Sequence, residues 1–301
     1  MSQKFYSANE ELNFDESLDK FEFLFQDMKS KPPTLEEALL DMFMNAQLSK
    51  EDAKEIYAHL ILVCNNRINA KWDMIKQEHT DISKDDALII SSYTYEPKKK
   101  FEKFSPYRLL NTNLVATNRK NGVINIEMYL FLFLRALRKL KKCKKNCLFR
   151  CINCKVKLAK DPNNVKYIPF IKGNEKIFWP FTSTSDDENI ALNFLGNGTG
   201  TKFKIIGDDL WGYDITLFNV YNEKEILLEP ERRYIVDNIK EGNITEITCK
   251  LLDNPQILEI CNFIKKIKVS IYFYILVSCN KYFINLEKCV LKNNNYLYRE
   301  V

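Results

Sequence analysis

Two glutamates flank one lysine in the segment 220–230, which reads VYNEKEILLEP. If this segment is a β-strand, Glu223 and Glu225 point to the same face, roughly 7 Å apart, and Lys224 points to the other face. Two like charges on one face of a strand repel each other and do not stabilise a fold. The pair is therefore either a solvated strand edge or part of a site that holds cations.

Other polar side chains that could bind a ligand or take part in a reaction are expected at the ends of two earlier strands. Arg150 lies among apolar residues in CLFRCI, and a buried guanidinium needs an anion or a carboxylate partner. Ser183 and Ser185 share one face of the extended stretch FTSTS, and Asp186 and Asp187 follow in the first turn of a short helix. Such hydroxyls either cap a helix or orient a carboxylate. Taken singly, each feature has a structural explanation.

The composition limits what these residues can belong to. The chain has 301 residues, 46% of them hydrophobic, which is enough for a sizeable core in one large or two small domains. Its net charge of +5 does not indicate nucleic-acid binding, and its 8 glycines form neither G-x-G-x-x-G nor G-x-x-x-x-G-K. The polar N-terminus does not resemble a signal peptide, and the apolar run 269–279 is too short to span a bilayer. We therefore expect a cytoplasmic protein.

The elements that must position these residues change in type along the chain. Helical apolar spacing follows the capping residues Thr34, Ser49 and Ser83, and a buried helix is predicted over 125–140. From about residue 146, short β-branched and aromatic runs predict strands, here identified by their residue ranges: 147–152, 176–185, 201–207, 215–221, 223–229, 232–239 and 244–252. Helices followed by strands indicate an α+β fold.

The three strand-end features occur in the order Arg, Ser, Glu. From about Ser83 to Asp253 the chain resembles the arginine-specific mono-ADP-ribosyltransferases, which carry an Arg–Ser–Glu triad with an E-x-E loop. The resemblance rests on ALIISSYT with YRLLNTNL, EMYLFLFLRALRKL, LFRCI, FTSTS with its following helix, and YNEKEILLEPERRYIV. It implies two packed, mainly antiparallel β-sheets around an NAD cleft, with helices on the N-terminal side. It also implies four segments: a loose start (1–33), a helical extension (34–81), a catalytic domain (82–253) and a C-terminal extension (254–301).

The resemblance further implies roles for individual residues. Arg150 would hold the pyrophosphate of NAD, which is the co-substrate, and Ser183 would position Glu225. Glu225 would stabilise the oxocarbenium-like cation that forms as nicotinamide leaves. Glu223 would hold and activate the acceptor guanidinium. Phe194 would pack on the nicotinamide, although plain core packing explains it equally well.

Two more residues enter through the resemblance, one as a match and one as a departure. Tyr221 lies just before the glutamates and would help to recognise the acceptor. Cys151 stands where the family has a glycine whose backbone comes close to nicotinamide, so its side chain would weaken NAD binding. A further departure is FNVY, at 218–221, where the family has a serine-containing run.

Cysteines and basic residues near Arg150 allow other interpretations. Cys143, Cys147, Cys151 and Cys154 could ligate zinc, but their spacing straddles a strand, so free thiols and no metal are expected. The run 138–145, RKLKKCKK, is interpreted as a solvated helix end rather than a nucleic-acid contact. Histidines occur at only two positions, both outside the strand region, which argues against the toxin-like subclass that uses a histidine for NAD.

The sequence therefore predicts an enzyme that transfers ADP-ribose from NAD to arginines of an acceptor protein. Two alternatives stay open. One is NAD hydrolysis with water as the acceptor, which would not need Glu223. The other is a non-catalytic module that binds NAD or a partner, which the substitution at Cys151 leaves open.

Overall fold

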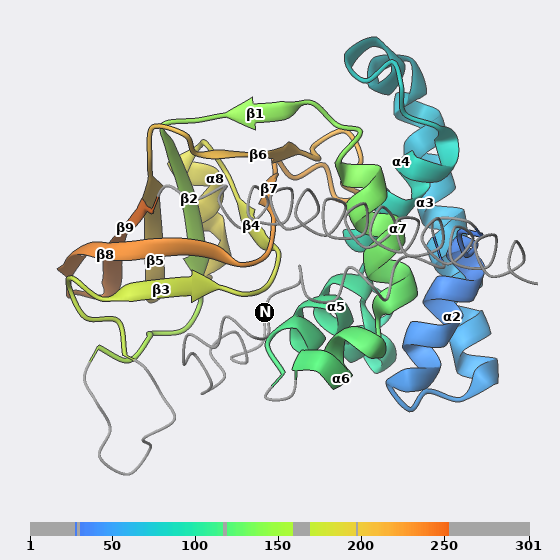
Figure 1. Cartoon of the computed structure of the whole chain (residues 1–301), viewed down its shortest axis with the longest axis horizontal. Coiled ribbons are helices and arrows are strands. Elements are labelled where there is room, and N and C mark those ends of the chain that lie inside the picture. Colours follow the sequence, from blue (N-terminus) through green and yellow to red (C-terminus); the bar gives the residue numbers. More distant parts are fainter. Residues whose placement is uncertain (1–27, 29–30, 117–118, 159–168, 197, 253–301) are drawn as a thin grey trace, which may run out of the picture. The chain divides into compact units, whose positions relative to one another are not determined.

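The structure is a computed structural model that describes residues 28, 31–116, 119–158, 169–196 and 198–252 (Figure 1). Most of the predicted N-terminal segment 1–33 and the whole predicted C-terminal extension 254–301 lie outside these residues. The predicted boundaries between segments stay predictions. Among the described residues, no helix is both long and apolar enough to cross a membrane.

The three predicted helix starts are confirmed. α2 (Leu35–Asn45) begins after Thr34, α3 (Lys50–Glu78) after Ser49 and α4 (Lys84–Tyr93) after Ser83. Each capping hydroxyl accepts a hydrogen bond from the backbone N–H three residues later, which satisfies one of the free donors of the first turn.

The remaining helical segments complete the N-terminal half. They are η4 (Lys99–Phe104), α5 (Pro106–Leu114), α6 (Arg119–Ile124) and α7 (Glu127–Leu137). α7 is the predicted buried helix, and its Tyr129, Leu130, Leu132 and Phe133 are fully enclosed. α2 and α4 both pack on α7, so the predicted extension 34–81 shares a hydrophobic core with the helices that follow it.

The strands form two sheets, which confirms the predicted α+β class. One sheet has the order β1-β6-β7-β4 and the other β2-β5-β9-β8-β3. All neighbouring strands run antiparallel except β5 and β9, which are parallel. The bounds are β1 (Lys142–Lys144), β2 (Cys147–Ile152), β3 (Glu175–Phe178), β4 (Thr182–Thr184), β5 (Gly200–Ile206), β6 (Trp211–Asp214), β7 (Ile226–Leu228), β8 (Arg232–Lys240) and β9 (Ile244–Leu251). A short α8 (Glu188–Leu192) and η5 (Asn193–Leu195) follow β4.

Several details of the predicted elements were wrong. The predicted strand 176–185 is divided into β3 and β4, which belong to different sheets. Residues 215–221, predicted as a strand, form turns, and the strand in this region is β6, just before them. The predicted strand 223–229 is reduced to β7, so both glutamates precede it. Part of the basic run 138–145 is the strand β1 rather than a helix end. In that run Lys142 lies 3.6 Å from the ring centre of Trp211, and Lys144 pairs with Asp209.

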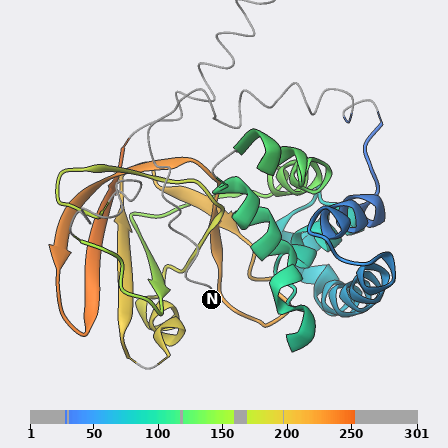
Figure 2. The same cartoon turned by 90° about the horizontal axis from the view of Figure 1, so that it is seen from below.

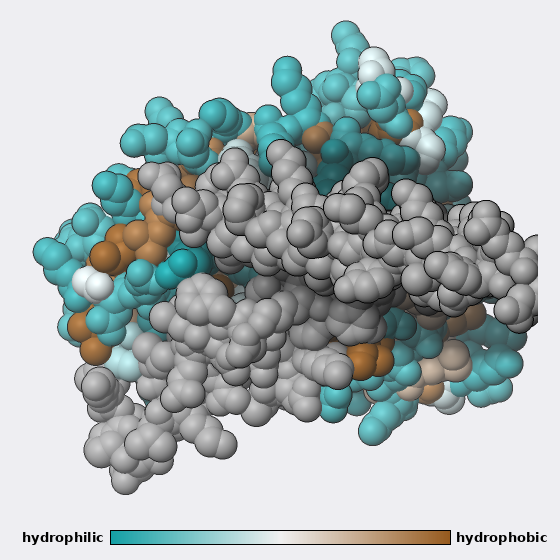
Figure 3. Space-filling model, viewed as in Figure 1, coloured by the Kyte–Doolittle hydropathy of each residue, from teal (hydrophilic) through white to brown (hydrophobic). Residues whose placement is uncertain are grey.

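Two cores meet at β7, which is buried on both faces. Leu227 packs into the helical core, whereas Ile226 and Leu228 pack into the core between the two sheets. Figures 1 and 2 show the helices on one side of β6 and β7 and the other sheet on the opposite side. β7 is therefore the element that brings the residues preceding it to the junction of helices and sheets. On the face shown in Figure 3, the described hydrophobic residues form small separate groups among hydrophilic ones.

Candidate active site

Arg150, Ser183 and the two glutamates come from three segments that the sheets bring together. Ser183 is paired with Leu227 in the β4–β7 ladder, so β4 runs beside the strand that follows the glutamates. β2 joins β4 through Phe149 and Ser185, which exchange two backbone hydrogen bonds of 2.7 and 2.8 Å. This bridge between the two sheets places Arg150 beside Ser183, and its Nη1 donates to the Ser183 carbonyl at 2.8 Å.

A pocket of about 230 Å³ opens at this junction. Of the seven residues to which the resemblance assigns a place at the NAD or acceptor site, all but Cys151 line it: Arg150, Ser183, Phe194, Tyr221, Glu223 and Glu225. Side chains from the helical half complete its wall, among them Tyr93, Glu96, Tyr107 and Asn111. The structure thus brings nearly all of the predicted residues to one place.

Glu225 is the buried carboxylate of this pocket, with 7% of the residue exposed. Burial raises its pKa, and hydrogen bonds from the side chains of Ser183 and Asn219 oppose that effect because they favour the charged form. The Asn219 bond, from Nδ2 to Oε2, is 2.9 Å long. The backbone is also fixed, because the Glu225 N–H donates to the Thr216 hydroxyl.

Glu223 is exposed and lies in the loop before β7, not on a strand as predicted. Partial burial raises the pKa of Glu223, and the negative charge of Glu96 raises it further. A hydrogen bond from Asn219 acts in the opposite direction. The two glutamates therefore differ in setting: one is enclosed and the other faces solvent at the pocket.

Lys224 interacts with a different group of side chains. Its ammonium lies 2.6 Å from Asp186, just before α8, and Lys145 contacts the same carboxylate at 2.6 Å. Burial would raise the pKa of Asp186, but hydrogen bonds from the two lysines hold it below its usual value. Asp186 precedes α8, and Asp187 is its N-cap, whereas both were predicted in the first helical turn. This ion pair attaches the glutamate loop to the start of α8.

Phe194 and Tyr221 both line the pocket but have different partners. Phe194 packs on the small cluster formed by Cys151, Ala191 and Leu195 and also reaches the pocket. The hydroxyl of Tyr221 is bonded to the backbone of Glu96, accepting from its N–H at 3.1 Å and donating to its carbonyl at 3.2 Å.

Cys151 is 3% exposed and lies outside the main pocket, although it lines a small adjoining one with Arg150 and Ser183. Burial raises the pKa of its thiol to about 11. Among the described residues, no three His, Cys, Asp or Glu side chains are grouped so that they could hold a metal ion.

Asn219, which bonds Glu225 directly, is a site residue that the sequence did not reveal, as are the pocket residues of the helical half. It is 2% exposed, donates to Glu225 through Nδ2, and accepts from the N–H of Tyr221 through Oδ1 at 2.8 Å. It fell within the run predicted as a strand, where an asparagine has no special meaning. The signal that could have revealed it is the pair of asparagines at 219 and 222, which is typical of tight turns.

The arrangement has clear chemical capacities. A buried, hydrogen-bonded carboxylate stabilises positive charge that develops beside it. A guanidinium on the same wall binds an anionic group, preferably through two parallel hydrogen bonds. An exposed carboxylate at the same pocket can hold a cationic partner and accept a proton from it.

Comparison with known proteins found similarity in structure only. No protein-family model and no curated protein matches the sequence. Several solved structures that resemble the chain are described as ADP-ribosyltransferases. The Vis toxin of Vibrio splendidus is 20% identical, with a TM-score of 0.42, over 65% of this chain and 86% of that one. HopU1 of Pseudomonas syringae pv. Tomato DC3000 is 16% identical, with a TM-score of 0.46, over 63% and 87%. The eucaryotic mono-ADP-ribosyltransferase ART2.2 is 15% identical, with a TM-score of 0.40, over 83% and 93%.

Proposed function

We propose that this chain transfers ADP-ribose from NAD to arginine side chains of an acceptor protein and releases nicotinamide. The observation that carries the proposal is the unequal pair of carboxylates. Glu225 is buried and held by Ser183 and Asn219, and Glu223, two residues earlier, is exposed at the same pocket. One suits a cation formed inside the pocket, and the other suits a cation that arrives from solvent.

The pyrophosphate and the nicotinamide ring of NAD would contact different residues of the pocket. Arg150 would bind the pyrophosphate, since a guanidinium matches phosphate oxygens in geometry and charge. Phe194, which packs at the edge of the pocket, would contact the nicotinamide ring. A pocket of about 230 Å³ suits the nicotinamide riboside end of NAD rather than the whole molecule.

The reaction would exchange one bond to the ribose for another. The glycosidic C–N bond breaks, nicotinamide leaves as a neutral base with the bonding electron pair, and positive charge develops on the ribose. The fixed carboxylate of Glu225 stabilises that charge. A guanidinium nitrogen of the acceptor, held by Glu223, forms the new C–N bond and gives its proton to Glu223. Tyr221, exposed beside the glutamates, would contact the acceptor.

Hydrolysis of NAD is the second candidate, and the exposure of Glu223 favours it, because water can reach the same side of the pocket. The two functions differ in what replaces nicotinamide. Both need Glu225, whereas only transfer needs the charge of Glu223.

The test is incubation of the full chain with labelled NAD, first with free arginine or agmatine and then with a protein lysate of the cytoplasm. Mass spectrometry identifies the modified side chain, and nicotinamide release is measured in parallel. Label on arginine supports the proposal. Free ADP-ribose alone supports hydrolysis, and absence of nicotinamide release refutes both. Glu241→Gln is the matched control, because Glu241 is an exposed glutamate outside the pocket.

A further inference from the structure

We infer that Arg67, on α3, is a positioning residue for Glu223: it fastens the loop 215–225 to the helical half of the fold and so holds the acceptor-facing carboxylate in place. This inference rests on the proposed function, because it assigns Glu223 to the acceptor. Arg67 itself does not line the pocket. It acts through the loop, which carries both glutamates between β6 and β7.

The loop is a closed unit with its own hydrogen bonds. At its base, the N–H of Ile215 donates to the carbonyl of Glu225 at 3.0 Å. Inside it, the N–H groups of Phe218 and Asn219 both donate to the Ile215 carbonyl at 3.0 Å. Phe218 is fully buried in the helical core and anchors the middle of the loop. These bonds close the base and the middle of the loop, whereas its outer side, around Thr216, Leu217 and Asn222, contacts α3.

Arg67 holds that outer side at three points. Its Nη2 donates to the Thr216 carbonyl at 2.9 Å and its Nε to the Leu217 carbonyl at 3.1 Å. Its Nη1 donates to Oδ1 of Asn222. One planar guanidinium therefore joins the beginning of the loop to its end, which suits the fixed fork of donors that arginine presents.

The contact with Asn222 explains why Glu223 depends on Arg67 more than Glu225 does. Asn222 has a φ of 58°, a left-handed conformation that asparagine adopts more readily than most residues other than glycine, and Glu223 follows it directly. Glu225 has bonds to Asn219 and the Thr216 hydroxyl within the loop, but it also has a partner outside the loop, Ser183, and directly precedes the buried strand β7. Loss of Arg67 should therefore loosen Glu223 more than Glu225, with the Lys224–Asp186 ion pair still holding the loop beside α8.

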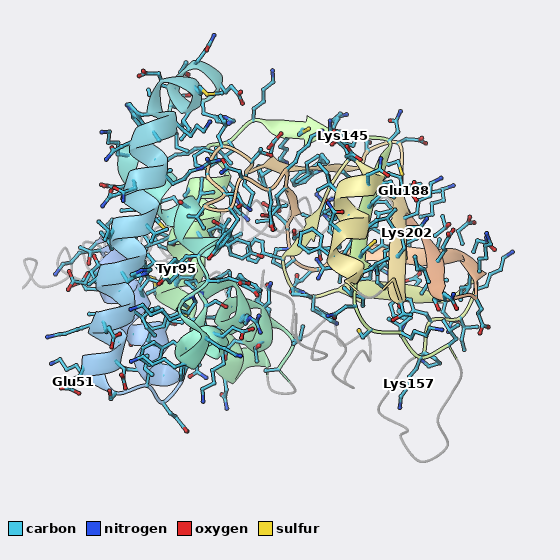
Figure 4. All side chains as sticks on the ribbon, turned by 180° about the vertical axis from the view of Figure 1, so that it is seen from behind. Glu51, Tyr95, Lys145, Lys157, Glu188 and Lys202 are labelled. Carbon is cyan, nitrogen blue, oxygen red and sulfur yellow. The ribbon has the colours of Figure 1, made fainter. Side chains whose placement is uncertain are left out.

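A second attachment shows that the loop is seated on the helices. The N–H of Val220 donates to the hydroxyl of Thr94, at the end of α4, at 3.1 Å. Tyr95, the next residue, lies against α3 in Figure 4, and its hydroxyl is 2.6 Å from Nδ1 of His59. The end of α4 is thus tied to the helix that carries Arg67. The loop is held by two linked helices rather than by one flexible side chain.

The first test measures both activities in Arg67→Gln. Removing one hydrogen bond to a charged group costs about 1.5–3 kcal/mol, so we expect the KM for agmatine to rise at least about tenfold. Nicotinamide release without acceptor should stay within about twofold, since Ser183 and the adjoining buried strand β7 still hold Glu225. Arg67→Lys should restore part of the effect. Asn222→Gly, which allows the same backbone conformation but lacks the amide, should reproduce part of the loss.

Lys54→Gln is the control for loss of a cation from α3, because Lys54 is exposed on the same helix. It should behave as the wild type in both assays. If Arg67→Gln lowers transfer and nicotinamide release in equal proportion, or changes neither, Arg67 does not position Glu223.

A second measurement does not depend on catalysis. Hydrogen exchange followed by mass spectrometry should show amides of 216–222 exchanging at least about tenfold faster in Arg67→Gln, with β8 and β9 unchanged, because one charged hydrogen bond is worth about that factor. Unchanged exchange in 216–222 would show that Arg67 does not hold the loop, whether or not the chain is active. If the wild type releases no nicotinamide but exchange rises as expected in Arg67→Gln, the attachment of the loop by Arg67 is confirmed as a structural contact only. The proposed function and the assignment to an acceptor site then fail.

Discussion

Asn219 offers a direct way to perturb the charge of Glu225 without changing that residue. Its Nδ2 donates to the Glu225 carboxylate at 2.9 Å in a site with almost no solvent. Two charged groups also act on Glu225: Glu223 raises its pKa and Arg150 lowers it. Removal of the amide donor therefore destabilises the charged form of a carboxylate whose pKa burial has already raised.

The expected shift follows from the strength of that bond. A hydrogen bond to a charged group contributes about 1.5–3 kcal/mol, which corresponds to about 1–2 pKa units. The proposed reaction needs charged Glu225, so activity is lost as the pH falls through its pKa. A higher pKa moves that loss to a higher pH. We expect the acid limb of nicotinamide release to move upward by about 1–2 pH units in Asn219→Ala.

The assay is nicotinamide release at saturating NAD as a function of pH. Asn219→Asp is the sharper variant, because its carboxylate can still accept from the Tyr221 N–H but adds a negative charge beside Glu225. Its acid limb should move at least as far as that of Asn219→Ala. Asn65→Ala, an exposed asparagine on α3, is the control. An unchanged acid limb in folded Asn219→Asp would refute the role given to Asn219. Because the two glutamates influence each other, the limb reports the pair rather than one residue.

Three further predictions concern the residues first noted in the sequence. Glu225→Gln should lower both nicotinamide release and transfer by about 100–1000-fold. Glu223→Gln should abolish arginine labelling and largely spare NAD hydrolysis. Equal losses in both assays would refute this division of roles between the two glutamates. Arg150→Ala should weaken NAD binding at least about tenfold in calorimetry, with partial recovery in Arg150→Lys, and unchanged affinity in the folded variant would make Arg150 purely structural. Cys151→Gly should lower the free energy of unfolding by roughly 1 kcal/mol, because a packed side chain is lost and a strand gains a glycine, while NAD affinity is preserved or improved; weaker binding would show that the side chain supports the pocket.

The helices could be predicted well because their signals are local. A capping hydroxyl, acidic residues in the first turn and apolar spacing all act within a few residues, and Thr34, Ser49 and Ser83 mark the starts correctly. Long strands such as β2 and β9 were found for the same reason. β1 and β6 were missed because they are short and contain glycine or lysine, so only their pairing with each other reveals them.

The loop 215–225 shows where sequence patterns fail. ITLFNVY is apolar and β-branched, which favours a strand, yet Ile215 and Phe218 are buried in the helical core through turns. A strand and a series of turns would both bury these apolar residues. The turns form hydrogen bonds with residues distant in sequence, here Arg67 and Thr94. The order Arg, Ser, Glu along the chain was enough to select the candidate site residues. Their relative positions could not be predicted, because these depend on contacts between residues far apart in the sequence.

The position of β7 links these observations. Both faces of this strand are buried, so a residue that follows or precedes it has little freedom to move, and Glu225 directly precedes it. Glu225 therefore takes its position from the sheets as well as from Asn219 and Thr216 of the loop, whereas Glu223, farther from the strand, depends more on the loop and on the helices that hold the loop. Stabilising a cation at the ribose and receiving an acceptor would thus be supported by different parts of the fold. We therefore expect substitution of Arg67 on α3 to change acceptor use more than nicotinamide release, even though the two glutamates are separated by a single residue.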